Sequence, residues 1–256
     1  MINIPILTIL GAAFTIGVRL TGLMLFAPFL GSLTIPVRVK ALLVLALTVL
    51  LLPAAGHQVL PQSPLEWPIL IVTEFTIGVG MGLVTNLIFE AAQLAGAILG
   101  VQMGYSLVNI LDPQSQVDTP VISTLYQSIA LLLFLRMNVH LWLVRAIGNS
   151  FSYLPPGNAH LSALFTTQVL KDAGSIFSVG VQIAAPVLAA TLAADVVLGL
   201  LGKASPQMPL MLLGPALKSM LGLGILAVTL KYWPDLFEQL FTASMTKGEQ
   251  LLHLAS

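Results

Sequence analysis

Six long apolar stretches make up most of this chain, and they constrain its fold more than any other feature. They cover approximately residues 4–31, 37–55, 68–101, 121–148, 173–203 and 208–233. A helix that crosses the hydrocarbon core of a bilayer needs about 20 mainly apolar residues. Only 8% of the residues are charged, against about 25% in a typical soluble domain. We therefore predict an all-α integral membrane protein, with about six broken or kinked apolar helices arranged as hairpins in a single domain over residues 1–256.

Several of these stretches are interrupted. The stretch 68–101 would be about 50 Å long as one helix, which exceeds a bilayer core of about 30 Å. Arg136 and Asn138 break the fourth stretch early, and Pro186 and Pro215 lie inside the fifth and sixth. Each proline removes a helix hydrogen bond and favours a kink. Short, broken helices suit a helical assembly better than an independent bundle in lipid.

The segment 100–120, GVQMGYSLVNILDPQSQVDTP, mixes glycines, amides and acids with apolar residues. Irregular backbone at membrane depth must be buried in protein or line a cavity. One interpretation is a solvated loop between helices. The other is a loop that folds back and closes a cavity, because glycine permits close backbone approach and apolar side chains exclude water. The candidate residues for this closure are Gly104, Tyr105, Ser106, Leu107, Asn109, Ile110, Asp112, Pro113, Gln114 and Gln116.

Ionisable residues inside the apolar stretches are costly and usually face protein or water. They could serve ion or proton coupling, or they could pair between helices or subunits. Pairing is favoured, because these charges do not form the chain of acids and histidines that a proton relay needs. The candidates for buried pairing or assembly are Arg19, Arg38, Lys40, Glu74, Glu90, Asp195 and Lys218.

Composition and motifs exclude several function classes. Ten basic and ten acidic residues cancel, so there is no basic field for nucleic acid. Cysteine is absent, which removes disulfides and thiolate nucleophiles. The four histidines are isolated, and no metalloprotease, phosphate-loop or serine-hydrolase motif occurs. We predict no enzymatic activity, no cofactor and no metal.

Two other classes remain as alternatives. A faint repeat at an offset of 102 residues aligns EAAQLAGAILG (90–100) with LAADVVLGLLG (192–202). Duplicated hairpins of this kind occur in secondary transporters, and a transporter would bind a small solute near Glu90 and Asp195. An intramembrane enzyme is the second alternative, although paired catalytic residues are missing. The amphipathic stretch 234–256 could lie at the membrane interface or bind a partner.

Four motifs resemble the FliR family of flagellar export-gate components and its injectisome relatives, the SctT group. The most specific is GVQMGYS (100–106) followed by Asp112-Pro113. The others are RLTG (19–22) with Pro28, IPVRVK (35–40), and VQI (181–183) with Pro186, Asp195, PQM (206–208) and Lys218. The sixth stretch departs from the family pattern, because Pro209 replaces an asparagine-like residue and Pro215 directly follows Gly214.

The resemblance implies a non-enzymatic channel subunit in a multi-pass arrangement within the bacterial inner membrane, in the flagellar basal body. Its partners would be FliP-like and FliQ-like export-gate subunits, a FlhB-like switch protein, unfolded secreted substrates and membrane lipid. In that family the loop matching residues 104–120 plugs the closed pore. The resemblance leaves open whether flagellar or injectisome export is served.

Overall fold

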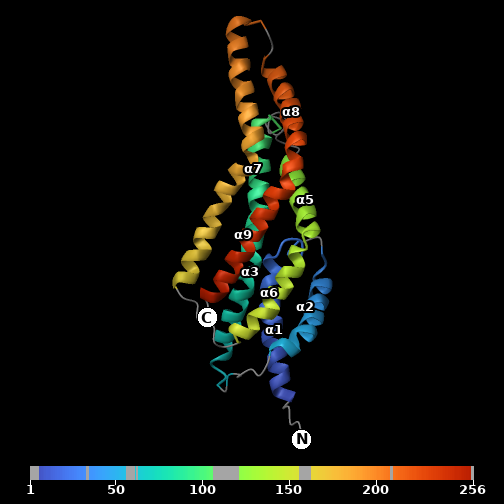
Figure 1. Cartoon of the computed structure of the whole chain (residues 1–256), viewed down its shortest axis with the longest axis vertical. Helices are drawn as coiled ribbons and strands as arrows, with labels where there is room; N and C mark the ends of the chain where they lie inside the picture. The colour runs from blue at the N-terminus through green and yellow to red at the C-terminus, as the bar shows by residue number, and fades with distance from the viewer. Residues whose placement is uncertain are drawn as a thin grey trace, which may run out of the picture. The chain divides into compact units, whose positions relative to one another are not determined.

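A computed structural model describes residues 6–32, 35–55, 61, 63–105, 121–155, 163–207 and 210–254, and within these ranges all regular structure is helical. The elements in chain order (Figure 1) are α1 (Ile6–Phe26), α2 (Val37–Leu51), η1 (Leu52–Ala55), α3 (Trp67–Gln102), α5 (Val121–Arg136), α6 (Val139–Tyr153), α7 (Ala163–Ala204), α8 (Leu210–Thr229), η2 (Leu230–Tyr232) and α9 (Trp233–Leu254). The predicted all-α fold is confirmed.

Four helical stretches are long and apolar enough to cross a membrane. They are Ile9–Phe26, Trp67–Gln102, Ala163–Ala204 and Leu213–Leu254. The pair α5 and α6 would add a fifth if it forms one broken span. The break falls where Arg136 and Asn138 predict it, because Asn138 takes a left-handed conformation with φ 56° between the two helices. Pro186 lies inside α7 and Pro215 inside α8.

Two stretches differ from the sequence-based expectation. Helix α7 begins at Ala163, ten residues before the expected start at 173. Its polar first turns stay helical because Asp172 is buried and pairs with Lys247 of α9 at 3.0 Å. Helix α9 also buries its own apolar face, which includes Phe241 and Leu251. The C-terminal stretch is therefore part of the fold. The sequence had suggested only that it lies at the membrane interface or binds a partner.

Residue contacts divide the chain into two compact units. Unit 1 comprises Met1–Leu87, Phe134–Gly174 and Leu240–Ser256, and unit 2 comprises Ile88–Leu133 and Ser175–Gln239. Helices α3, α5, α7 and α9 contribute residues to both units. The single domain over residues 1–256 stays a prediction.

In unit 1, α1 and α3 lie in direct backbone contact. A Cβ at Gly78 would collide with the Arg19 carbonyl oxygen, and one at Gly82 would lie 2.8 Å from the Leu23 carbonyl oxygen. Small residues let helices approach this closely. The contacts advance together along both helices, from Arg19 and Gly78 to Leu23 and Gly82, so α1 and α3 run parallel.

In unit 2, α3 packs on α5 and α7, and α7 forms a hairpin with α8. Gly96 of α3 lies against the Ser123 backbone of α5, and Gly180 of α7 faces the Ala91 carbonyl oxygen of α3 at 3.1 Å from its built Cβ position. Tyr126 of α5 contacts the Trp233 ring edge-on, with centroids 4.7 Å apart. Glycine contacts of this kind again bring helix backbones together without intervening side chains.

Candidate functional site

The turn that ends α3 is the described part of the predicted closure segment. The Tyr105 N–H donates to the Gly100 carbonyl at 2.9 Å, and the Gly104 N–H donates to the Val101 carbonyl at 3.1 Å. This pair of bonds is a Schellman motif, which ends a helix at a residue with positive φ. Gly104 supplies that residue with φ 89°. Helix α3 therefore ends at this point because Gly104 can adopt the positive φ that the motif requires.

Most of the predicted closure lies outside the described residues. Gly104 and Tyr105 are described, and Tyr105 is exposed. Eight candidates fall outside, namely Ser106, Leu107, Asn109, Ile110, Asp112, Pro113, Gln114 and Gln116. Closure by this segment stays a prediction, and its structural basis is the turn from which it leaves.

A cluster centred on Asp195 ties the end of α3 to α7 and α8. The Gln102 Nε2 donates to Asp195 Oδ2 at 2.6 Å, and the Lys218 Nζ lies 3.0 Å from Asp195 Oδ1. Both carboxylate oxygens are thus engaged, one by an amide of α3 and the other by an ammonium of α8. The Lys218 side chain is only 17% exposed and that of Asp195 is 41% exposed, so the pair is partly shielded from solvent.

Three further contacts hold the same turn on α8. The Tyr105 hydroxyl and the Ser219 Oγ lie 2.7 Å apart and share a hydrogen bond. A Cβ built on Gly104 would lie 2.7 Å from the Pro215 Cβ. One built on Gly222 would lie 2.7 Å from the Met103 Cε. The turn therefore fits α8 only because position 104 has no side chain.

A second cluster surrounds Arg19 in the core of unit 1. Arg19 is fully buried and its Nε donates to Glu74 Oε2 at 2.7 Å. Its other nitrogens donate to the Ser150 Oγ at 2.7 Å and the Leu154 carbonyl at 3.2 Å. The guanidinium carbon also lies 4.2 Å from the centroid of the Phe151 ring. Arg19 thus joins α1 to α3, to α6 and to the residue that follows α6.

The structure brings together four of the seven charges predicted to pair, as Arg19 with Glu74 and Lys218 with Asp195. Glu90 is exposed on α3, and Arg38 is exposed on α2. Lys40 is half-buried and donates to the Gly31 carbonyl at 3.1 Å. A role of these residues in assembly stays a prediction.

The ion pair of Asp172 with Lys247 was not predicted from the sequence, and neither was Gln168, whose Nε2 donates to Asp172 Oδ2 at 3.1 Å. The available signal was an acid just before the fifth apolar stretch and a base in the amphipathic stretch 234–256. Within the described residues, no group of three or more histidines and acids could hold a metal. These clusters hold helices together through charge-assisted hydrogen bonds, which are stronger than neutral hydrogen bonds.

Long apolar helices joined by buried and partly buried ion pairs define a multi-pass helical membrane protein. The chain belongs to the family of bacterial export proteins, family 1, whose model matches residues 10–244. The matched range contains the Gly104 turn and both clusters.

Individual relatives cover most of the chain. It is 31% identical over 224 residues to the flagellar biosynthetic protein FliR of Escherichia coli, which covers 88% of this chain and 86% of that protein. The FliR of Pectobacterium carotovorum is 30% identical over 226 residues, 88% of this chain and 86% of that protein. The FliR of Bacillus subtilis is 28% identical over 192 residues, 74% of each. The resemblance to the FliR family is confirmed.

Proposed function

We propose that this chain is a subunit of the flagellar type III protein export gate in the bacterial inner membrane, within the basal body. The observation that carries the proposal is the family match over residues 10–244, together with relatives named as flagellar biosynthetic proteins. Its role is structural and not enzymatic, since it helps to form and close the pore through which unfolded flagellar substrates pass.

The segment from Tyr105 to Gln116 is the movable closure in this proposal. The geometry of its origin supports this role, because the Gly104 turn is pinned to α7 and α8 through Asp195 and Ser219. A closure needs a fixed base if its apolar residues are to return to the same place after each opening. Gly104 provides an abrupt exit from α3, and the residue types of Asp112-Pro113 are typical of a turn.

Partner subunits explain the apolar surface of unit 2. Large apolar side chains are exposed along α7 and α8, among them Val196, Leu200 and Met220. Surfaces of this kind mark contact with lipid or with other helices. FliP-like and FliQ-like subunits would supply those helices, and a FlhB-like switch protein would bind the assembled gate.

Deletion of residues 106–116 tests the closure. The variant retains Gln102 to Tyr105, so the Asp195 cluster still holds the end of α3. We expect the gate to assemble and the membrane to leak ions, measured as conductance of inverted vesicles or as loss of membrane potential in cells.

A matched control replaces residues 106–116 with a glycine-serine linker of the same length. This control should also leak, because the apolar side chains and not the chain length exclude water. Unchanged conductance in the deletion variant, with a gate that has assembled, would overturn the closure proposal.

A further inference from the structure

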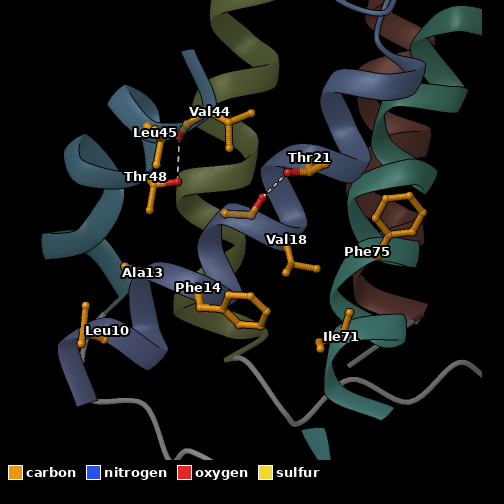
Figure 2. A pocket seen from close by; sticks show the side chains of 11 residues that line it. Leu10, Ala13, Phe14, Val18, Thr21, Val44, Leu45, Thr48, Ile71 and Phe75 are labelled. Carbon is orange, nitrogen blue, oxygen red and sulfur yellow. Dashed lines mark hydrogen bonds between the residues drawn. The ribbon is translucent and has the colours of Figure 1, made fainter. Parts of the chain in front are cut away.

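An apolar groove lies in unit 1 between α1, α2 and α3, with a volume of about 520 Å³ (Figure 2). Its two hydroxyl groups donate within their own helices, Thr21 to the Gly17 carbonyl and Thr48 to the Val44 carbonyl, each at 2.7 Å. The remaining lining side chains are apolar. The groove therefore presents hydrocarbon and methyl groups to whatever occupies it.

The groove has the length of one membrane leaflet. Its lining on α1 extends from Leu10 to Thr21, which is about 16 Å at the helical rise. Half of a bilayer hydrocarbon core is about 15 Å. The lining belongs to the apolar stretch Ile9–Phe26, and Leu10 and Leu45 remain 60% and 62% exposed. An acyl chain of the surrounding lipid can therefore enter from the side.

Two cations lie in the first turn of α2, one on each side of the helix face that lines the groove. Lys40 precedes the lining residue Val44 by four positions, and Arg38 precedes Leu45 by seven. These spacings place each pair on one helix face, about 6 and 10 Å apart along the axis. The cations thus lie beyond one end of the apolar lining, where a lipid headgroup would sit above its acyl chain.

The charge of this region is unbalanced. Residues 1–65 contain Arg19, Arg38 and Lys40 but no aspartate or glutamate. Glu74 neutralises Arg19. In the part of the chain that the structure describes, neither Arg38 nor Lys40 takes part in an ion pair. Two positive charges therefore remain, and one anionic group would neutralise half of this excess.

We propose that this groove binds one acyl chain of an anionic phospholipid, whose phosphate is held by Arg38 and Lys40. An arginine fork binds phosphate oxygens bidentately. Lys40 keeps two of its three donors, because one serves the Gly31 carbonyl. A docked partner helix would also cover the groove, but it would not require two cations beyond one end. The proposal is independent of pore closure.

Tryptophan quenching in nanodiscs tests the site on the full chain. The Trp67 ring lies 6.1 Å from the ring of Phe14, which lines the groove. The variant Trp142→Phe/Trp233→Phe leaves Trp67 as the reporter. Dibrominated phosphatidylglycerol should quench it at a lower mole fraction than dibrominated phosphatidylcholine. Each cation near a membrane surface contributes about a fivefold preference for anionic lipid.

Two variants separate the headgroup site from the groove. Arg38→Gln/Lys40→Gln should abolish the preference for phosphatidylglycerol, whereas Arg145→Gln, which removes an exposed cation of α6, should retain it. Gly17→Leu should fill the groove and reduce quenching by both lipids. It should still fold, since a Cβ there meets only Thr48 Oγ1, at 3.6 Å.

Native mass spectrometry of the chain with all three of its tryptophans provides a second measurement. We expect the unmodified chain to retain phosphatidylglycerol and the Arg38→Gln/Lys40→Gln variant to lose it. Equal quenching by the two lipids, or no effect of Gly17→Leu, would overturn the proposal. Loss of co-purifying membrane subunits in Gly17→Leu, with quenching unchanged, would assign the groove to a partner helix and also overturn it.

Discussion

Arg19 shows how a single residue organises the core of unit 1. Its guanidinium meets a carboxylate, a hydroxyl, a carbonyl and an aromatic face. Removing a charge from water is expensive, and good geometry with further hydrogen bonds is needed to compensate. The residues around Arg19 meet that requirement, so the ion pair specifies which helices meet.

Arg19→Met should lower the free energy of unfolding by about 3–5 kcal/mol, because Glu74 would remain charged and buried. The double variant Arg19→Met/Glu74→Met should recover most of that loss. Denaturant titration in detergent micelles measures both. Arg145→Met, at an exposed position, should stay within about 0.5 kcal/mol of the unmodified chain. Equal losses in the single and double variants would contradict a role for the pair.

The sequence predicted that Arg19 and Glu74 carry buried charge, but not that they pair with each other. Arg19 and Glu74 stand out because ions are rare in apolar helices. The choice of Glu74 over Glu90 depends on the approach of α1 to α3, which hydropathy does not encode. Ser150 and Phe151 carried no signal, since a hydroxyl and a phenyl ring are ordinary just after the end of an apolar stretch.

At the scale of elements, glycines decide which helices touch. Gly22, Gly78 and Gly82 form the contact between α1 and α3, with backbone atoms of the neighbouring helix where a Cβ would stand. Backbone cannot move aside as a flexible side chain can. A methyl group at this contact would therefore separate the helices and stretch the Arg19 ion pair.

Gly78→Ala should lower the thermal midpoint of unit 1, because the added methyl collides with the Arg19 carbonyl. Gly199→Ala is the matched control, since nothing lies within 4 Å of a Cβ there. Alanine is favoured over glycine inside a helix by about 0.5–1 kcal/mol, so the control should be neutral or stabilising. Circular dichroism melting separates the two, and equal midpoints would argue against direct helix contact.

Helix positions could be predicted wherever about 20 apolar residues run together. The start of α7 and the packing of α9 could not. Hydropathy counts Asp172 and Lys247 as polar interruptions, whereas the fold joins them across two helices. The Schellman turn at Gly104 was present in the sequence as a glycine after an apolar run, a signal that marks a helix end.

For the whole molecule, burial is uneven. In the most apolar window of α3, 50% of the residues are buried, but only 22% are buried in that of α7 and 17% in that of Leu213–Leu254. A chain with so much apolar surface on its later helices depends on lipid or on other proteins to cover it.

Co-expression with partner subunits tests this dependence. It also distinguishes the export-gate proposal from the alternative of a secondary transporter. We expect the chain to elute as a larger, monodisperse species when it is extracted with FliP-like and FliQ-like subunits, and to aggregate in mild detergent without them. Size-exclusion chromatography with light scattering measures both. A chain that is monodisperse alone, and that binds neither subunit, would favour the transporter.

The contact between Gly104 and Pro215 couples the evolution of two distant positions. The pyrrolidine ring occupies the space that a side chain at position 104 would need, and the positive φ of Gly104 disfavours other residues. Substitutions at the two sites are therefore epistatic. A side chain at 104 should therefore be tolerated better when position 215 has lost bulk, which a scan of paired substitutions measures.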